Sequence, residues 1–300
     1  MPARRIGNRV TIIRTPRKPR RVRARRATGG STAARPRTTR AGSDPLYNQS
    51  VDKAFAVLRA FSAADLRALG LAEIAAAARM TLSSAQRSLH TLVQLGYLRR
   101  DARLRGWALT PRTLDIGYPY LAGHPVIEQA TPHLIDLNQA CGESVSLSEP
   151  DGLDMVFIAR FPSRKPFFIH MPVGRRLPMY CTAAGRAYLS ALPPSEAREI
   201  LERSTLRAFT PTTLHDVPSI LAMIGEARES GYAWANQEYY LGDLVIAAPI
   251  LGERGRPVAV INIAGTTSRS TLEELRTQFA PLLQAAARAA AGSVAASRRR

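Results

Sequence analysis

The chain has 300 residues, of which 45% are hydrophobic and 22% charged, so it is long enough for two globular domains. No apolar run reaches 18 residues and no apolar segment follows the basic start, so we expect neither a transmembrane helix nor a signal peptide. The two cysteines, Cys141 and Cys181, are too few for a disulfide framework and too isolated for a zinc site. We therefore expect a reduced, cytoplasmic protein with no metal and no cofactor.

The formal net charge of +19 is concentrated at the N-terminal end of the chain. Residues 1–43 contain 14 Lys or Arg and no acidic residue, residues 44–110 contain 9 basic and 5 acidic residues, and the rest is nearly neutral. This asymmetry predicts an anionic polymer as the partner of the N-terminal part and a smaller ligand for the C-terminal part.

The first 43 residues are rich in Arg and Pro and lack apolar periodicity, which predicts a disordered basic tail. Its predicted role is to bind DNA phosphates without reading sequence. Two alternatives stay open, namely an inert solvated segment and a start codon placed too far upstream.

Apolar residues at helical spacing predict three short helices, at residues 51–61, 71–78 and 85–93. Thr81 or Ser83 is suited to cap the N-terminus of the third helix, and Gly96 to end it. Strand-like residues 97–100 and 107–110, joined by a polar loop that ends at Gly106, predict a hairpin.

This order of three helices and a basic hairpin is typical of a winged helix-turn-helix, which we place at residues 44–110. The first two helices would brace the third so that its outer face fits the major groove. The predicted DNA-binding residues are Thr81, Ser83, Ser84, Gln86, Arg87, His90, Thr91, Arg99, Arg100, Arg103 and Arg105. The alternatives are that single members merely form a solvated surface, or that the whole winged helix binds another protein.

Residues 111–124 predict a short linker helix that stops near Pro119. Beyond it, helices are predicted at residues 126–139, 183–191, 195–202, 219–230 and 271–291. Strands are predicted at residues 144–148, 155–161, 167–171, 244–250 and 258–264. The last helix starts with a capping box, residues 271–274 (TLEE). Residues 125–292 should therefore form a mixed α+β domain with a mainly antiparallel sheet flanked by helices, followed by a basic tail at residues 293–300.

The loop at residues 180–186 is the strongest candidate for a ligand site in this second domain. Its small residues let backbone N–H groups approach a carboxylate, and the N-terminus of the next helix favours the same anion. The predicted effector-binding residues are Met179, Tyr180, Cys181, Thr182, Ala183, Ala184, Gly185, Arg186, Asn236, Glu238, Asp243 and Val245, with Arg175 and Arg176 as further charge partners. In the alternative interpretation Thr182 caps the helix, Gly185 permits close packing, the arginines face solvent and Cys181 is a small buried thiol.

From about Gln49 to Gly292 the chain resembles the IclR family of transcriptional regulators. The resemblance rests on residues 71–78 (LAEIAAAA), 83–92 (SSAQRSLHTL), 173–187 (VGRRLPMYCTAAGRA), 247–250 (AAPI) and 258–265 (VAVINIAG). It implies a winged helix followed by a GAF-like effector domain, a homodimer or dimer of dimers, and a small organic acid as effector. Residues 177–186 (LPMYCTAAGR) and 236–238 (NQE) most resemble the branch that controls aromatic-acid catabolism, including the protocatechuate and 4-hydroxybenzoate regulators of the β-ketoadipate pathway.

The sequence departs from the family pattern in its helix-turn-helix and in its effector domain. The usual Gly-Leu before the recognition helix is Arg79-Met80, so a residue with a Cβ must form the turn. Many relatives have Asp at the position of Ala235 and Cys at that of Val245. A more apolar pocket is expected, which favours a larger or aromatic ligand and puts glyoxylate-like effectors in doubt.

The sequence thus predicts a regulator, not an enzyme, whose affinity for a palindromic operator changes when an aromatic or dicarboxylic acid binds. It allows RNA polymerase as a further partner and gives no sign of a membrane. The alternatives are an architectural or ligand-independent DNA-binding protein and, less favoured, an enzyme using the C-terminal pocket. No nucleophile-elbow, zinc-protease or nucleotide-binding motif supports an enzyme.

Replacing residues 1–43 by an uncharged segment of equal length should weaken DNA binding alike on every sequence. The tail contributes phosphate contacts, so its loss should also flatten the dependence of log K on log salt concentration. Fluorescence-anisotropy titrations of specific and scrambled duplexes between about 50 and 200 mM salt would measure both effects. An unaltered salt slope would show that the tail does not touch DNA.

Overall fold

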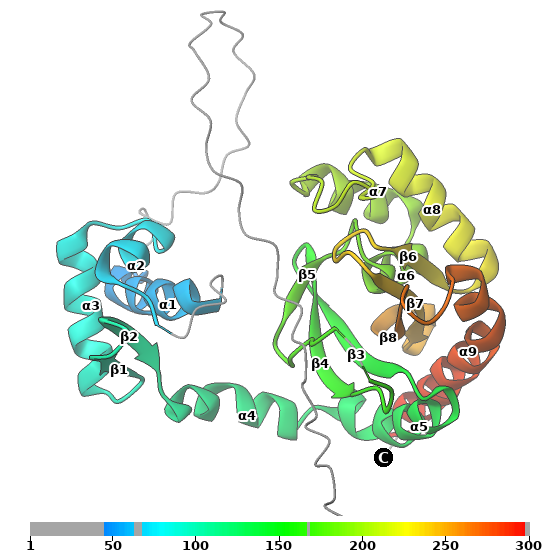
Figure 1. Ribbon diagram of the computed structural model, residues 1–300, viewed down its shortest axis with the longest axis horizontal. Helices are drawn as coiled ribbons and strands as arrows, with labels where there is room; N and C mark the ends of the chain where they lie inside the picture. The colour runs from blue at the N-terminus through cyan, green and yellow to red at the C-terminus, as the bar shows by residue number, and fades with distance from the viewer. Residues whose placement is uncertain (1–44, 63–67, 167–168, 298–300) are drawn as a thin grey trace, which may run out of the picture. The chain divides into compact units, whose positions relative to one another are not determined.

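The computed structural model describes residues 45–62, 68–166 and 169–297 (Figure 1). These residues form two units, and the boundary between them along the chain lies between Ala122 and Gly123. The predicted basic tail, residues 1–43, lies outside the described residues. No helix within the described ranges is long and apolar enough to cross a membrane.

The N-terminal unit has the predicted order of elements. It comprises α1 (Gln49–Ser62), α2 (Leu71–Ala77), α3 (Leu82–Gln94), β1 (Leu98–Asp101) and β2 (Gly106–Leu109). Its core is formed by apolar side chains that the three helices and the hairpin bury, including Val57, Phe61, Ile74, Leu89, Leu92 and Leu98. Thr81 is the N-cap of α3, since its Oγ1 accepts a hydrogen bond from Ser84 N, and Gly96 follows the helix at a φ of +80°.

The β1–β2 hairpin is antiparallel, with Leu98 opposite Leu109 and Asp101 opposite Gly106. It is followed by the short 3-10 helix η1 (Pro111–Thr113) and by α4 (Leu114–Ala122). The prediction that this helix stops near Pro119 is wrong, because α4 continues through it. A proline removes one main-chain hydrogen bond, and the turns on either side can still form.

The C-terminal unit is built on one six-stranded sheet in which every neighbouring pair is antiparallel, in the order β5-β4-β3-β8-β7-β6. The strands are β3 (Ser144–Asp151), β4 (Asp154–Phe161), β5 (Arg176–Pro178), β6 (Ala233–Asn236), β7 (Asp243–Leu251) and β8 (Pro257–Thr266), with the 3-10 helix η2 (Glu253–Gly255) before β8. This confirms the α+β class and the mainly antiparallel sheet.

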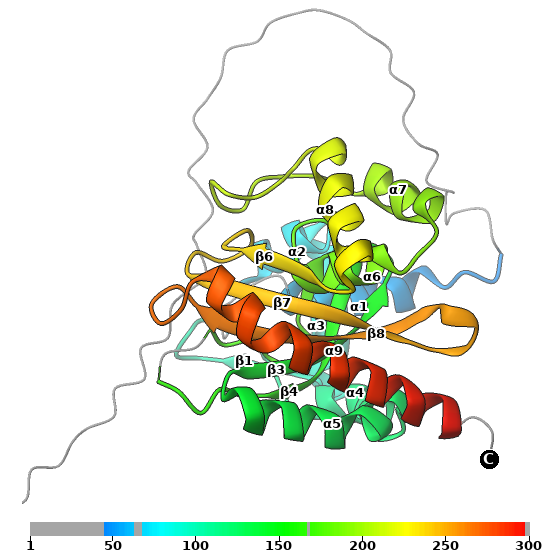
Figure 2. The same ribbon diagram turned by 90° about the vertical axis from the view of Figure 1, so that its right-hand side faces the viewer.

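Helices cover both faces of this sheet (Figure 2). On one face lie α5 (Pro125–Cys141) and α9 (Leu272–Ser297), and on the other α6 (Ala183–Ser190), α7 (Pro194–Arg203) and α8 (Val217–Ser230). The predicted capping box of α9 is present, because Glu274 N donates to Thr271 Oγ1 and Thr271 N donates to Glu274 Oε2. The helix then runs beyond its predicted end at residue 291 into the segment expected to be a tail, since Ala-rich sequence favours helix.

One strand prediction differs from the structure, and two short strands were not predicted. The strand predicted at residues 167–171 falls partly outside the described residues, and residues 169–171 are not in a strand. Met171 is instead buried against Phe157 and Leu177, so its apolar character serves packing rather than pairing. Strands β5 and β6 were not predicted, because three and four residues are too few to show a period of two.

Arg79 adopts the left-handed conformation, with a φ of +53°, in the turn between α2 and α3. A residue with a Cβ pays roughly 1–2 kcal/mol there, whereas glycine does not. Its side chain is exposed, so nothing visible compensates for the strain.

Arg79→Gly should therefore raise the free energy of unfolding by about 0.5–1 kcal/mol, after the larger chain entropy of glycine in the unfolded state is subtracted. Urea unfolding followed by circular dichroism would measure the change. Arg103→Gly, in the hairpin loop and without a positive φ, should slightly destabilise the protein and serves as the control. A loss of stability in Arg79→Gly equal to that control would contradict the strain.

Candidate DNA-binding surface and effector pocket

The outer face of α3 presents polar side chains that the fold itself does not use. Ala85, Leu89 and Leu92 point inward and are buried, as their helical spacing predicts. On the opposite face Gln86 and Arg87, together with His90, are exposed, and within the described ranges no hydrogen bond or ion pair engages their side chains. These three side chains are free to reach base edges or phosphates.

Four other candidates on α3 are partly engaged by the helix. Thr81 caps it, and the hydroxyl of Ser83 lies 3.3 Å from that of Thr81. Thr91 Oγ1 donates to Arg87 O at 3.1 Å, and Ser84 is half-buried. Their first role is therefore to shape the start and the surface of α3, with DNA contacts as an addition.

The four predicted arginines of the hairpin are all exposed. Arg99 forms an ion pair with Asp101 at 3.2 Å, and the Arg100 guanidinium lies 5.0 Å from the centre of the Trp107 ring. Arg103 and Arg105 are exposed in the loop between the strands. Ion pairing and stacking of this kind orient a guanidinium and leave donors for phosphate oxygens.

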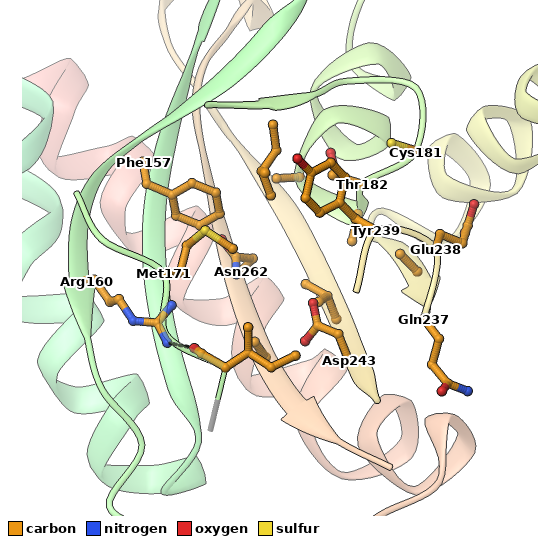
Figure 3. Close-up of a pocket in the computed structure, with 17 residues that line it drawn as sticks. Phe157, Arg160, Met171, Cys181, Thr182, Gln237, Glu238, Tyr239, Asp243 and Asn262 are labelled. Carbon is orange, nitrogen blue, oxygen red and sulfur yellow. Dashed lines mark hydrogen bonds between the residues drawn. The ribbon is translucent and has the colours of Figure 1, made fainter. Parts of the chain in front are cut away.

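A hollow opens between the sheet of the C-terminal unit and the N-terminus of α6 (Figure 3). The empty space in the hollow, together with the open solvent at its mouth, amounts to about 560 Å³. Its walls are mostly apolar, with a few polar groups, which is the usual character of a small-molecule site. The lining residues are Phe157, Arg160, Ile169, Met171, Leu177, Cys181, Thr182, Ala183, Ala184, Ala235, Gln237, Glu238, Tyr239, Asp243, Val245, Asn262 and Ala264.

The strand register explains which side chains reach the floor of the hollow. Ser146 of β3 is paired with Arg160 of β4 on one side and with Asn262 of β8 on the other, so the three share a face. Figure 3 shows Arg160, Asn262 and Asp243 reaching the hollow from β4, β8 and β7. The Arg160 guanidinium donates to Ile169 O at 2.7 Å and to Ser144 Oγ at 3.2 Å, which holds it in place.

Asp243 and Arg160 form a charged end of the hollow. Burial raises the pKa of Asp243 to about 7, although the positive charge of Arg160 acts in the opposite direction. Burial likewise lowers the pKa of Arg160, with Asp243 opposing. Burial therefore outweighs the attraction between the two groups, which form no ion pair among the described residues, and the Asp243 carboxylate can be protonated near neutral pH.

The N-terminus of α6 forms the other end. Thr182 Oγ1 accepts a hydrogen bond from Gly185 N at 3.1 Å, whereas the first-turn amides of Ala183 and Ala184 have no partner inside the helix. A Cβ at Gly185 would lie 2.2 Å from Met179 Cα, so only glycine allows the loop to pass this closely. The helix dipole and the unused amides favour an anion at this end.

Seven of the twelve predicted effector-binding residues line the hollow: Cys181, Thr182, Ala183, Ala184, Glu238, Asp243 and Val245. Met179, Gly185 and Asn236 lie beside the hollow and do not line it. Tyr180 is turned away, since its hydroxyl donates to Arg207 O at 2.8 Å and accepts from Arg207 N at 3.1 Å.

Arg186 does not line the hollow either, although its charge made it a candidate. Its side chain is fully buried, and it donates two hydrogen bonds of 2.5 Å to the carboxylate of Glu238. Arg175 bonds to the Tyr240 hydroxyl, and Arg176 pairs with two surface aspartates, so neither reaches the hollow. The arginine that does so is Arg160.

The sequence prediction missed ten of the lining residues, including Arg160, Asn262 and Tyr239. Asn262 carried a usable signal, since it is the one amide in the apolar segment 258–264. Arg160 carried none, because a single arginine near the end of a strand is ordinary on a surface.

Cys181 lies in the wall as an inert thiol. Burial raises its pKa to about 12, so the thiolate that a nucleophile needs is not formed near neutral pH. Across the described residues, no group of three or more His, Cys, Asp or Glu is placed to hold a metal ion.

Comparisons with known proteins agree along most of the chain. Residues 118–291 match the family model "Bacterial transcriptional regulator IclR C-terminal", and residues 50–102 match "IclR helix-turn-helix domain". The Pca regulon regulatory protein of Pseudomonas putida is 35% identical over 246 residues, which cover 82% of this chain and 84% of that protein.

Two solved structures have the same fold. A transcriptional regulator from Rhodococcus sp. RHA1 is similar with a TM-score of 0.70 and 34% identity, covering 84% of this chain and 100% of that one. An IclR homologue of Microbacterium hydrocarbonoxydans, complexed with 4-hydroxybenzoate, has a TM-score of 0.65 and 22% identity, covering 82% of this chain and 98% of that one.

Asp243→Asn should make the protein more stable at pH 8 than the parent, by about 2 kcal/mol after allowance for partial exposure. The folded state binds the Asp243 proton more tightly than the unfolded state, so the parent loses stability as pH rises from about 4 to 7. Thermal unfolding from pH 5 to pH 8 measures this difference, which should shrink at the acid end.

The control is Asp216→Asn at the N-cap of α8, where hydrogen bonds from Ser219 lower the pKa of the carboxyl. That variant should lose stability at pH 8, since it removes a charge that the helix start favours. Equal and unchanged stability of Asp243→Asn at both pH values would contradict the burial of this carboxylate.

Proposed function

The chain belongs to the IclR family of bacterial transcriptional regulators. We propose that a small organic acid, bound in the hollow beside α6, controls the affinity of the protein for a palindromic operator. The family consists of DNA-binding regulators with an effector-binding C-terminal domain, not of enzymes. The observation that carries the effector part is the mostly apolar hollow, which has the first-turn amides of α6 at one end and the buried groups Arg160 and Asp243 at the other.

On DNA, α3 enters the major groove with Gln86, Arg87 and His90 toward the bases. Arg87 is the candidate for a bidentate contact with guanine, which is worth about 1–3 kcal/mol of discrimination. The hairpin arginines, Arg99, Arg100, Arg103 and Arg105, then hold the flanking phosphates or enter the minor groove. The exposure of these side chains supports the assignment.

Two copies would place their α3 helices in successive major grooves, about 34–36 Å apart. The apolar character of α4 supports such a pairing. Within the described residues none of its side chains is buried, and Leu114 is 68%, Ile116 51% and Tyr118 70% exposed. A second copy that covers this helix would remove apolar surface from water.

The effector places its carboxylate at the amides of Ala183 and Ala184. Its apolar body lies between Phe157, Met171 and Leu177. We propose an aromatic or dicarboxylic acid, since the walls are too apolar to suit a two-carbon acid. The Pca relative and the homologue crystallised with 4-hydroxybenzoate support the aromatic choice.

Binding changes operator affinity because the two ends of the hollow belong to different parts of the C-terminal unit. An acid that joins α6 to β4 and β7 favours one arrangement of these elements over another. A coupling of about 1–3 kcal/mol suffices for a roughly 5- to 150-fold change in operator affinity.

Arg87→Ala should reduce affinity for a specific operator to the level of scrambled DNA. A duplex selected from a random library by the full-length protein serves as operator, and anisotropy titrations at one salt concentration compare the two sequences. Arg59→Ala on α1, which removes the same charge from an exposed side chain, should keep specificity. Full operator affinity in Arg87→Ala would refute the role of α3.

The same titrations, repeated with 4-hydroxybenzoate, should shift the operator affinity of the parent. No shift with any aromatic or dicarboxylic acid would point to the alternative of a ligand-independent DNA-binding protein. The role of α3 in DNA recognition and the role of the hollow in effector binding are therefore tested separately.

A further inference from the structure

Leu104 is an exposed apolar side chain at the tip of the β1–β2 hairpin. The loop of the hairpin consists of residues 102–105 (ARLR), between the paired residues Asp101 and Gly106. Leu104 is 53% exposed there. A single exposed leucine is ordinary on a protein surface and carries no meaning by itself. The groups around this leucine indicate what it binds.

The loop is held at its base by hydrogen bonds. Asp101 Oδ1 accepts a hydrogen bond from Leu104 N at 3.0 Å, and this bond is the main reason why the pKa of Asp101 lies below its usual value. On the other strand, Trp107 exchanges two main-chain hydrogen bonds of 2.9 Å with Leu69. A Cβ on Gly106 would lie 2.7 Å from Leu69 O, so the two segments are in close contact. Leu104 thus lies in a loop that is already ordered, which lowers the entropic cost of inserting its side chain into a partner.

Two arginines flank Leu104 and are available to an anionic partner. Arg103 and Arg105 are exposed, and within the described ranges no hydrogen bond or ion pair engages either guanidinium. Arg105 also has a φ of +49°, in the left-handed region where glycine or asparagine is usual. A free arginine in a strained backbone position indicates that its charge is used outside the fold. The partner of this loop is therefore anionic, and it must also accept the apolar side chain between the two charges.

Duplex DNA fits this combination of groups. Proteins that bind the minor groove combine arginine contacts with an apolar side chain, such as leucine, that enters between two base pairs. The inserted side chain partly unstacks the two base pairs and bends the duplex by about 20–90°. An acidic protein surface can pair with the arginines, but the leucine between them would then face carboxylates instead of an apolar surface.

We propose, on the basis of the DNA-binding function proposed above, that Leu104 is a wedge that the hairpin inserts between two base pairs from the minor groove. Arg103 and Arg105 bind the phosphates beside it. The step that receives Leu104 lies outside the bases that α3 reads. It is a pyrimidine–purine step, TA or CA, because these steps unstack most easily. The operator is thereby selected at a position where no base edge is contacted.

The fluorescence of 2-aminopurine, an adenine analogue that brightens when it is unstacked, tests this insertion. The analogue replaces each adenine of a selected operator in turn, and the full-length protein is added to saturation. Fluorescence should rise at a TA or CA step outside the bases that α3 reads and stay low at the other adenines.

Leu104→Ala should abolish this rise in fluorescence, because a methyl group is too short to separate two base pairs. Its melting temperature should equal that of the parent, since Leu104 is exposed, so the loss does not reflect unfolding. The matched control is Leu109→Ala. Leu109 is 39% exposed at the opposite end of the hairpin, where it pairs with Leu98, and its replacement should leave the rise intact.

A mismatch at the step where fluorescence rises gives a second measurement. Mismatched base pairs are easier to unstack, so the mismatch should raise the affinity of the parent for the operator about tenfold. Leu104→Ala should gain nothing from it. Anisotropy titrations with matched and mismatched duplexes compare the two proteins.

Selective operator binding by the parent with no rise in fluorescence at any adenine would overturn the wedge and leave the role of α3 intact. A rise that persists in Leu104→Ala would overturn it as well. Equal binding of operator and scrambled DNA by the parent would overturn both the reading by α3 and this inference. Sedimentation without DNA separates the remaining case, because a changed oligomeric state of Leu104→Ala would show that the leucine packs against protein and that the wedge is wrong.

Discussion

The buried ion pair between Arg186 and Glu238 holds the C-terminal unit together around its pocket. Besides its two bonds to Glu238, the guanidinium donates to Tyr180 O at 3.2 Å, and the carboxylate accepts from Leu214 N at 3.2 Å. Helix α6, the segment before α8 and the segment before β7 thereby meet at one charge pair. Leaving one of two such buried charges unpaired costs about 3–5 kcal/mol, so these segments keep a single arrangement.

This arrangement decides the electrostatics of the hollow. Arg186 and Glu238 neutralise each other, whereas burial favours the uncharged form of Asp243 beside Arg160. Positive potential comes from Arg160 and from the first turn of α6, where the amides of Ala183 and Ala184 have no partner inside the helix. A site with positive groups and mostly apolar walls suits an acid that has an apolar body.

Much of the fold could be predicted from the sequence, because local periodicity and caps mark helices such as α3 and α9 directly. The site could be predicted only in part. Residues 181–184 were found because a small-residue loop before a helix is a local signal. Arg160 was missed because its role depends on the pairing of β3 with β4, which shifts by a bulge after Leu147. A bulge reverses which side chains of a strand point to a given face of the sheet, and the neighbouring residues give no signal that predicts it. Arg186 was favoured because its partner Glu238 lies 52 residues away in the sequence, so no local signal shows that the charge is already paired.

Gly185 divides the pocket into a part that tolerates change and a part that does not. A side chain at this position would collide with the backbone at Met179, so the anion-holding end has almost no freedom to vary. The floor instead consists of alternate residues on β4, β7 and β8, each of which can be exchanged without moving its strand. Sequence divergence within such a scaffold should therefore preserve binding of the effector's carboxylate and change which effector body the pocket accepts. New inducers would be acquired by one or two substitutions in the sheet, which makes this domain a convenient starting point for engineered biosensors.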